Sequence, residues 1–565
     1  MRVALATGRR LVSWSEDEIP DSQPESRACM FYVIGSGPAA ISAAVALTSR
    51  GLPVTILDAG RTLEREKQEI LDRLGALPHE QWPAADLDTL RGGDQTKRQG
   101  SIHVKLTYGS DYPYAHEGGP LLDTDEEPPF HYSEARGGLS NVWGASQLPS
   151  RAEDIADWPI GIGDLEPHYR AVFDFMPTTA QIDGLDSLLP TYTDRGQDLR
   201  PSRQADEFLS DLETNQKRLR RAGVHFGRSR VAVTGGNDEW RMPNDETRSG
   251  CVYCGLCLYG CPYRLIYSTT STLQRLIEEK KVTYLARHVV EKLEPNGDGV
   301  TIFARDLERE EEVSFRAVRV FVGAGVLPTA WLTLRSLGAY DEAVEMLDSQ
   351  YFIYPFFRFR RTPDVQSEAL HSLVQAFIEI DDPAISRHLV HLEIFSYSDF
   401  LKRALFATPL RFFLRFPWIA EQMFGRLLVV QGFLHSRDSG RLRLMLHQNA
   451  TGRPRLHVEA QPSAHAWWSS LKAGLKLVAN ARSLGGAPVV PAMQFAEPGR
   501  SYHSGGTFPM RAKPGKFETD TLGQPTGLER VHLLDASVFP SIPATTITLT
   551  VMANAHRIAS QAAAL

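Results

Sequence analysis

CMFYVIGSGPAAISAAVALTSRGLPVTILDAG, residues 29–60, has the order of a strand, a helix and a second strand. Its apolar run Phe31–Ile34 predicts a buried parallel strand, because a sheet covered on both faces needs no polar alternation. Small apolar residues continue as a helix, which Gly51 and Pro53 end before a second strand at residues 54–57. This βαβ unit predicts an α/β fold built on a parallel sheet.

The turn between the first strand and the helix reads GSGPAA, residues 35–40, and matches the pattern G-x-G-x-x-G/A. Gly35 permits the tight turn, Gly37 lets the backbone approach a pyrophosphate, and Ala40 keeps the helix close to the strand. The helix N-terminus offers unpaired N–H groups to phosphate. Asp58, at the end of the second strand, can accept hydrogen bonds from a ribose. A turn without ligand would not need all of these in register, so a bound dinucleotide is favoured.

The composition of the 565 residues is ordinary for a soluble globular protein, with 42% hydrophobic and 23% charged residues. The 61 basic and 68 acidic residues give a net charge of −7, so a nucleic-acid partner is not expected. The sequence has no run of 18 uncharged apolar residues, and its first 27 residues lack the apolar stretch of a secretory signal. These features predict a cytoplasmic protein without a transmembrane segment.

Four separated blocks resemble the glucose–methanol–choline (GMC) family of FAD-dependent oxidoreductases. They are GSGPAA…ILDAG (35–60), RGGLSNVWGA (136–145), VRVFVGAGVLPTAWLTLRS (318–336), and YHSGGTFPM (502–510) with HLLDASVFPSIPATTITLTVMANAHRIAS (532–560). The blocks stand in the family's order along most of the chain. The resemblance implies an enzyme that binds FAD and acts on CH–OH groups.

The resemblance also implies the domain organisation. It predicts an α/β fold with a discontinuous Rossmann-like FAD-binding domain and a second, α+β substrate domain that contains an antiparallel sheet. The FAD-binding domain would comprise residues 1–150, 231–345 and 496–565. Residues 151–230 and 346–495, which match no motif of the family, would form the substrate-binding domain.

The contacts to FAD follow from the same resemblance. It implies that the cofactor is bound by Gly35, Gly37, Pro38, Ala39, Asp58, Ala59, Gly138, Ser140, Asn141, Gly144, Ala145, Val290, Asp535, Ala536 and Thr546. Val290 is explained almost as well as an ordinary core valine. Some members of the family attach FAD through a histidine in the glycine–serine loop, where this chain has Val142. Because valine has no nucleophile, we expect the FAD to be non-covalent.

His503, in YHSGGT, is the candidate catalytic base. Oxidation of an alcohol by hydride transfer leaves a proton on the substrate oxygen, and an imidazole is suited to take it. A surface-loop histidine is the alternative, and the family match favours the catalytic role. The family's second histidine or asparagine is absent, and Thr546 is the best candidate for that position. Its hydroxyl can bond the substrate oxygen but cannot act as a base, and as an alternative it could cap the C-terminal helix.

We therefore predict the oxidation of an alcohol carbon to a carbonyl, with hydride passing to flavin N5 and the proton to His503. The substrate would be a small-molecule alcohol such as a sugar, a glycoside or another natural product, with long-chain or terpenoid alcohols as the second choice. The electron acceptor would be oxygen or a redox partner. Two alternatives remain: a flavoenzyme with non-oxidative or light-driven chemistry, and an electron-transfer component centred on the cysteine-rich segment.

The run Cys251, Cys254, Cys257 and Cys261 has the spacing C-x₂-C-x₂-C-x₃-C-P of bacterial ferredoxins, so these are candidate ligands of an iron–sulfur cluster. In two-cluster ferredoxins the fourth cysteine of such a run serves the other cluster, and this chain has no second run. A single cluster would need a tight local wrap or a distant ligand, and Cys29 is the only other cysteine. A loop of disulfides or reduced thiols without metal explains the run equally well. Zinc is less natural, because structural zinc sites split their cysteines into separated pairs.

Residues 401–426 combine five basic residues with many large apolar side chains. Such a segment could rest on an anionic membrane surface or guard an apolar substrate entrance. A core-facing helix pair, whose arginine stems cover apolar surface, is the favoured interpretation. Pro409 and Pro417 would interrupt any long helix.

Overall fold

The computed structural model describes residues 30–92, 98–99, 102–103, 105–116, 131–236, 239–241 and 247–564. Cys29 and the N-terminal segment examined for a signal sequence lie outside these residues.

Five parallel strands form the sheet that the βαβ stretch predicts. β1 (Phe31–Ile34) is central, with β2 (Val54–Leu57) on one side and β12 (Arg319–Val322) on the other. β8 (Val282–Leu285) and β23 (Val531–Leu533) lie at the two edges. All four residues of β1 are buried, as its apolar sequence predicts.

Helices cover this sheet, and one from the N-terminal part of the described chain packs against one from its C-terminal part. α1 (Pro38–Thr48) begins with proline in its first turn, where the missing N–H costs nothing, and continues with small residues that permit close packing. α14 (Thr548–Ala562) packs against it, and Ser42 donates a 2.7 Å hydrogen bond to the Met552 carbonyl. The other helices around this sheet are α4 (Ile162–Phe173), α7 (Thr269–Glu278) and α8 (Val326–Ser336).

An antiparallel meander stands beside the parallel sheet. β9 (His288–Asn296) pairs with β10 (Gly299–Asp306), and β10 pairs with β11 (Glu311–Ala317). The turn between β9 and β10 lies at Asn296-Gly-Asp-Gly, where the sequence predicts it.

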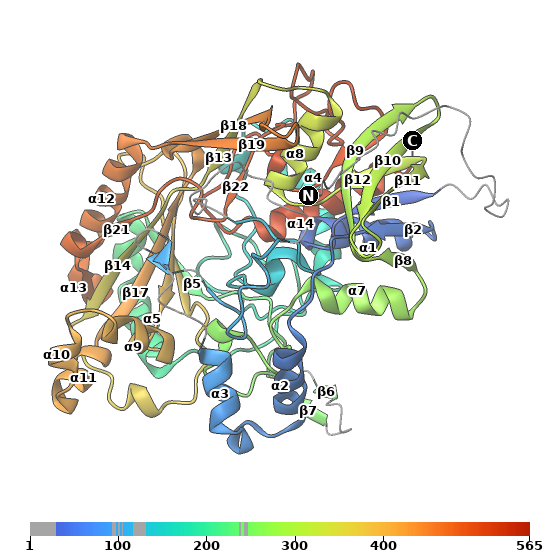
Figure 1. Ribbon diagram of the computed structural model, residues 1–565. Helices are drawn as coiled ribbons and strands as arrows, with labels where there is room; N and C mark the ends of the chain where they lie inside the picture. Colours follow the sequence, from blue (N-terminus) through green and yellow to red (C-terminus); the bar gives the residue numbers. More distant parts are fainter. Residues whose placement is uncertain are drawn as a thin grey trace, which may run out of the picture.

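A second, antiparallel layer faces the parallel one across the molecule (Figure 1). Its seven strands are ordered β20 (Gly486–Pro488), β14 (Tyr351–Arg358), β17 (Leu427–Leu434), β16 (Val390–Phe395), β15 (Ala376–Ile380) and β5 (Val224–Arg228), with β21 (Gln494–Phe495) also on β14. A further sheet has the order β19 (Pro454–Gln461), β18 (Arg441–Gln448), β13 (Ala343–Asp348) and β22 (Ser504–Gly505). The predicted mixed α/β fold, with a parallel sheet and a separate antiparallel sheet, is confirmed. The exact domain boundaries stay a prediction.

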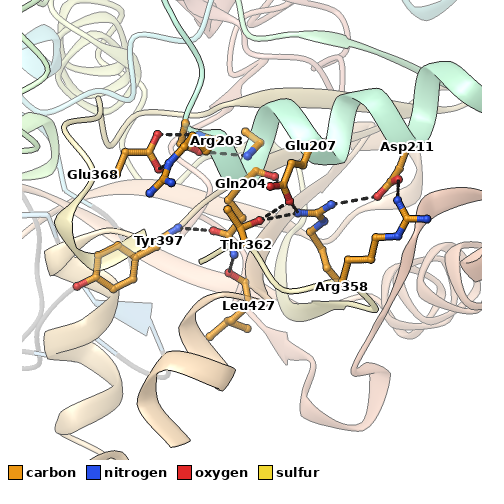
Figure 2. Close-up of polar contacts among 12 residues, drawn as sticks. Arg203, Gln204, Glu207, Asp211, Arg358, Thr362, Glu368, Tyr397 and Leu427 are labelled. Carbon is orange, nitrogen blue, oxygen red and sulfur yellow. Dashed lines mark hydrogen bonds and ion pairs between the residues drawn. The ribbon is translucent and has the colours of Figure 1, made fainter. Parts of the chain in front are cut away.

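A buried arginine ties α5 (Arg203–Thr214) to the seven-stranded sheet (Figure 2). Arg358 is 2% exposed, and its guanidinium lies 2.8 Å from Glu207 and 3.0 Å from Asp211, which are one turn apart on α5. It also donates a 2.9 Å hydrogen bond to the Thr362 hydroxyl. Ion pairs as well as apolar packing therefore hold α5 against the end of β14. The remaining helices of this layer are α6 (Gln216–Arg221), α12 (Ala464–Ala479) and α13 (Ala481–Leu484).

A third group of elements surrounds the cysteine-rich segment. α2 (Arg65–Ala76) and α3 (Ala84–Arg91) pack their apolar faces against residues 256–265 in one small core. The short strand pairs β3–β4 (Arg98–Gln99 and Ile102–His103) and β6–β7 (Glu239–Arg241 and Thr247–Ser249) complete the chain.

The expectation that residues 401–426 form a core-facing helix pair is wrong. The segment forms three short helices, α9 (Asp399–Phe406), α10 (Arg411–Leu414) and α11 (Pro417–Phe424). Only three of its apolar side chains are buried, and Phe413 and Trp418 are more than 60% exposed. The prolines limit each helix to at most eight residues, so the apolar side chains do not share one inward face.

Candidate active site

The dinucleotide loop has the geometry that its glycines predict. Gly35 has φ of +94°, and a Cβ there would lie 2.8 Å from the carbonyl oxygen of Gly323 in the loop after β12. The two loops therefore touch through backbone alone. Gly37 stands before α1, and among the described residues no side chain caps this helix. The first N–H groups of α1 are thus available for an anion such as a pyrophosphate.

Asp58 lies at the end of β2, where the sequence places it. It is 7% exposed and accepts a 2.8 Å hydrogen bond from the Tyr284 hydroxyl and another from Ser36. Burial raises the pKa of Asp58 to about 6, against the opposing effect of these hydrogen bonds. A carboxylate can accept about four hydrogen bonds, so capacity remains for a ribose. Ala59 follows on the same edge of the sheet.

The glycine–serine–asparagine loop lies directly on the dinucleotide loop. A Cβ on Gly138 would lie 3.2 Å from the Cα of Gly37. The side chains of Ser140 and Asn141 bond within this loop, Ser140 to the Gly137 carbonyl at 2.6 Å and Asn141 to the Gly138 carbonyl at 2.8 Å. Both therefore hold the loop in shape, and contact with a cofactor would fall to its backbone. Gly144 and Ala145 complete this loop, and a Cβ on Gly144 would meet open space among the described residues.

Asp535 joins the end of β23 to the start of α8. Its carboxylate accepts hydrogen bonds from the Gly325 N–H at 3.0 Å and the Thr329 hydroxyl at 2.6 Å. Ala536, the next residue, accepts from the Gly506 N–H at 2.8 Å, which links this edge to the His503 segment. Val290 lies in β9 and is a buried core residue.

His503 is held on a turn that a buried carboxylate clamps. Asp348, at the end of β13, accepts hydrogen bonds from the hydroxyls of Ser501 at 2.6 Å and Ser504 at 2.8 Å. The His503 ring lies 4.7 Å from the Phe433 ring, and its Nδ1 has no hydrogen-bond partner in the described part of the chain. Burial lowers the pKa of His503 to about 4, so the ring is neutral at pH 7 and can accept a proton. Asp348 was not found from the sequence, since it lies some 150 residues away.

Thr546 does not cap the C-terminal helix. α14 begins at Thr548 with Ile547 at its N-cap position, so the capping interpretation is wrong. The Thr546 side chain is 6% exposed, and its hydroxyl finds no partner among the described residues. A buried hydroxyl without a partner is uncommon in proteins and indicates a place for a ligand atom.

A buried row of charge lies near His503, and the sequence analysis missed it. His391 on β16 lies 2.6 Å from Glu379 on β15 and 3.8 Å from Glu393, and all three are less than 9% exposed. Burial would lower the pKa of His391, but the two carboxylates raise it to about 9. Burial alone would raise the pKa of Glu393, but His391 holds it below its usual value. Charged residues inside the apolar strands FIEI and VHLEIF were the available signal.

The four cysteines of residues 251–261 line one cavity. Its empty volume, part of it open to solvent, is about 390 Å³. All four are free thiols, so the disulfide interpretation is wrong for this run. In the described ranges, no three His, Cys, Asp or Glu side chains are arranged to hold a single metal ion. The described helices also include none that is long and apolar enough to cross a membrane.

Comparison with known proteins agrees with this geometry. Residues 436–555 match the family model described as GMC oxidoreductase, and no curated protein matches the chain. Among solved structures, pyridoxine 4-oxidase from Mesorbium loti has a TM-score of 0.56 and 13% identity, covering 94% of this chain and 99% of that one. A formate oxidase has a TM-score of 0.56 and 13% identity, covering 96% and 99%. A variant of the Aspergillus oryzae formate oxidase, made to study FAD modification, has a TM-score of 0.55 and 14% identity over the same shares.

These comparisons offer no support for an iron–sulfur cluster. They concern the fold over nearly the whole chain and the family over its C-terminal part. Residues 436–555 are thus similar to the GMC oxidoreductase family, and the chain as a whole shares its fold with the oxidase structures named above.

Proposed function

We propose that the enzyme binds FAD non-covalently and oxidises an alcohol carbon to a carbonyl, with His503 as the base. The observation that carries the proposal is the neutral His503 ring, clamped on its turn by Asp348 and lacking a partner for Nδ1 in the described structure. When bound, FAD supplies the acceptor for the hydride of the alcohol carbon.

Three features of the chain fit this cofactor. The uncapped start of α1 and the Gly35–Gly323 backbone contact form a cradle that any Cβ would fill. Asp58 retains capacity for a ribose. The Thr546 hydroxyl, buried without a partner among the described residues, lies just before α14, whose N-terminal dipole favours negative charge. Val142 stands where a covalent link would form, and it has no nucleophile.

The chemistry of the chain's own residues follows from the pKa of His503. The neutral imidazole takes the hydroxyl proton of the alcohol as the carbonyl forms, and releases it when the product leaves. Asp348 fixes the turn that carries the ring by accepting hydrogen bonds from Ser501 and Ser504, on both sides of His503. Thr546 can donate a hydrogen bond to the substrate oxygen but cannot replace the base.

The polar character of the surroundings favours a hydroxyl-rich substrate, such as a sugar or a glycoside, over a long-chain alcohol. Glu393 lies beside His391, which holds the pKa of this carboxyl below its usual value, so Glu393 is ionised. Gln147 is 2% exposed, and neither atom of its amide has a partner in the described ranges. Buried polar groups of this kind are costly unless a polar ligand satisfies them.

The test is anaerobic mixing of the purified holoenzyme with single alcohols from each class. Loss of the flavin absorbance near 450 nm with a glycoside, and not with an alkanol of similar size, would support the proposal. Flavin that no alcohol reduces would contradict it. Oxygen is the first acceptor to examine, because the neighbouring structures are named as oxidases. Peroxide formed at one equivalent per carbonyl would establish oxygen as the acceptor.

A further inference from the structure

The cavity in residues 251–261 brings four thiols to one place. Cys251, Cys254, Cys257 and Cys261 all line it, and the rest of its wall is almost entirely apolar. The sequence left open whether the fourth cysteine could join the other three. In the fold, all four cysteines line the same cavity.

The backbone achieves this wrap through left-handed residues. Gly250, Gly255 and Gly260 have φ of +48°, +75° and +107°, and the non-glycine residues Tyr253 and Arg264 have φ of +57° and +56°. Residues other than glycine rarely adopt such conformations, and these persist only where the surrounding structure requires them.

Backbone N–H groups point at two of the sulfur atoms. The Tyr253 N–H donates to Cys251 Sγ and the Leu265 N–H donates to Cys261 Sγ, each at 3.4 Å. Hydrogen bonds to sulfur set the potential of protein-bound clusters. These backbone N–H groups would therefore orient the two cysteines as ligands, as outer contacts do at other metal sites.

A buried histidine also lines the cavity, and one of its ring nitrogens has no hydrogen-bond partner among the described residues. His371 is 1% exposed, and its Nδ1 lies 3.2 Å from the amide nitrogen of Gln375, which also donates to the carbonyls of His371 and Leu373. The orientation of that amide is fixed, because its oxygen accepts from the Ser202 N–H at 2.8 Å. The proton of the neutral ring is then on Nε2, which has no partner in the described part of the chain. A sulfide or thiolate in the cavity would be the missing acceptor.

Two cations stand beside the thiols. The guanidinium of Arg200 lies 4.5 Å from the centroid of the Tyr253 ring, within the cysteine run, and burial lowers the pKa of Lys105 to about 8. Lys105 also donates a 2.9 Å hydrogen bond to the Trp143 carbonyl, in the loop that lies on the dinucleotide loop. Positive charge therefore lies near the cysteine run, and Lys105 contacts the loop that lies on the dinucleotide loop.

We infer that this cavity holds an iron–sulfur cluster of the [4Fe–4S] type, bound by Cys251, Cys254, Cys257 and Cys261, with His371 donating to one of its sulfur atoms. In such a cluster each cysteine binds a different iron. The cluster would give the protein a one-electron centre beside the flavin loop. This inference does not rest on the proposed alcohol oxidation.

The test is iron and acid-labile sulfide analysis of the full-length protein, purified without oxygen and treated with ferrous iron and sulfide. We expect about four iron and four sulfide per chain, with an EPR signal that appears or disappears on reduction with dithionite. Flavin-containing protein without iron after this treatment would overturn the inference. One zinc per chain in place of iron would also overturn it.

Variants separate the ligands from the rest of the chain. Cys257→Ser should lose the EPR signal and most of the iron, whereas Cys29→Ser, at the only cysteine outside the run, should keep both. Because Cys257→Ser could also disturb folding, His371→Phe provides a second measurement. It should retain the iron and shift the reduction potential of the cluster, since one hydrogen bond to sulfur is lost. Equal iron in Cys257→Ser and the parent would contradict the assignment.

Discussion

Replacement of His503 by alanine is the sharpest test of the proposed site. A positioned base contributes roughly 10²–10⁴ to a rate, which corresponds to about 2.7–5.5 kcal/mol at 1.36 kcal/mol for each tenfold change. We expect His503→Ala to slow anaerobic flavin reduction by such a factor. FAD occupancy should be unchanged, because the described contacts of the dinucleotide loop do not involve His503. His465→Ala is the matched control, since this histidine is 59% exposed and bonds Asp438.

The pH dependence of the same step follows from the burial of His503. A pKa of about 4 leaves about one ring in a thousand protonated at pH 7. The rate of flavin reduction at low substrate concentration should therefore be flat from pH 8 down to about pH 5. Below that it should fall as the ring becomes protonated, to half its plateau near pH 4. A midpoint close to 6.5, the value for an exposed histidine, would refute the argument from burial, and a variant as fast as the parent would refute the role of His503.

Three further predictions concern the hydroxyl, the cofactor and the fold. Thr546→Val should slow flavin reduction about fivefold, because one hydrogen bond of about 1 kcal/mol is lost. A loss as large as that of His503→Ala would show that Thr546 does more than donate one hydrogen bond. Acid or heat denaturation should release all FAD into the supernatant because Val142 offers no attachment, and yellow precipitate would disprove this. Arg358→Ala should reduce the free energy of unfolding by about 3 kcal/mol, the low end for a broken buried ion pair, because Glu207 and Asp211 remain partly exposed. Arg360→Ala, at an 83% exposed neighbour 4.0 Å from Asp211, should change it by less than about 0.5 kcal/mol in urea titration.

The elements that the sequence predicts well are those whose causes are local. β1, α1 and β2 depend on apolar runs, glycines and prolines within 30 residues, and their bounds in the structure agree with the pattern. The turn at Asn296-Gly-Asp-Gly is similarly local. The segment at residues 401–426 was misjudged because its composition does not reveal which side chains face inward once prolines divide it.

The candidate site shows where local reasoning ends. His503 and Thr546 could be named from the resemblance, but the Asp348 clamp depends on pairing between β13 and β22, which are far apart in sequence. The shared cavity of the four cysteines likewise depends on left-handed residues, two of which are not glycine. Their spacing matches that of a ferredoxin cluster, and the fold brings all four residues to the lining of one cavity.

The buried charges near His503 are best understood through strand register. Glu379 on β15 pairs directly opposite His391 on β16, and His391 pairs opposite Phe433 on β17, whose ring meets His503. No pattern within one strand specifies this row. Buried ion pairs are weak contributors to stability, because desolvation offsets their attraction. We therefore propose that the row serves the substrate that His503 would deprotonate, since a fixed negative charge on Glu393 can accept hydrogen bonds from the hydroxyls beside the reacting carbon.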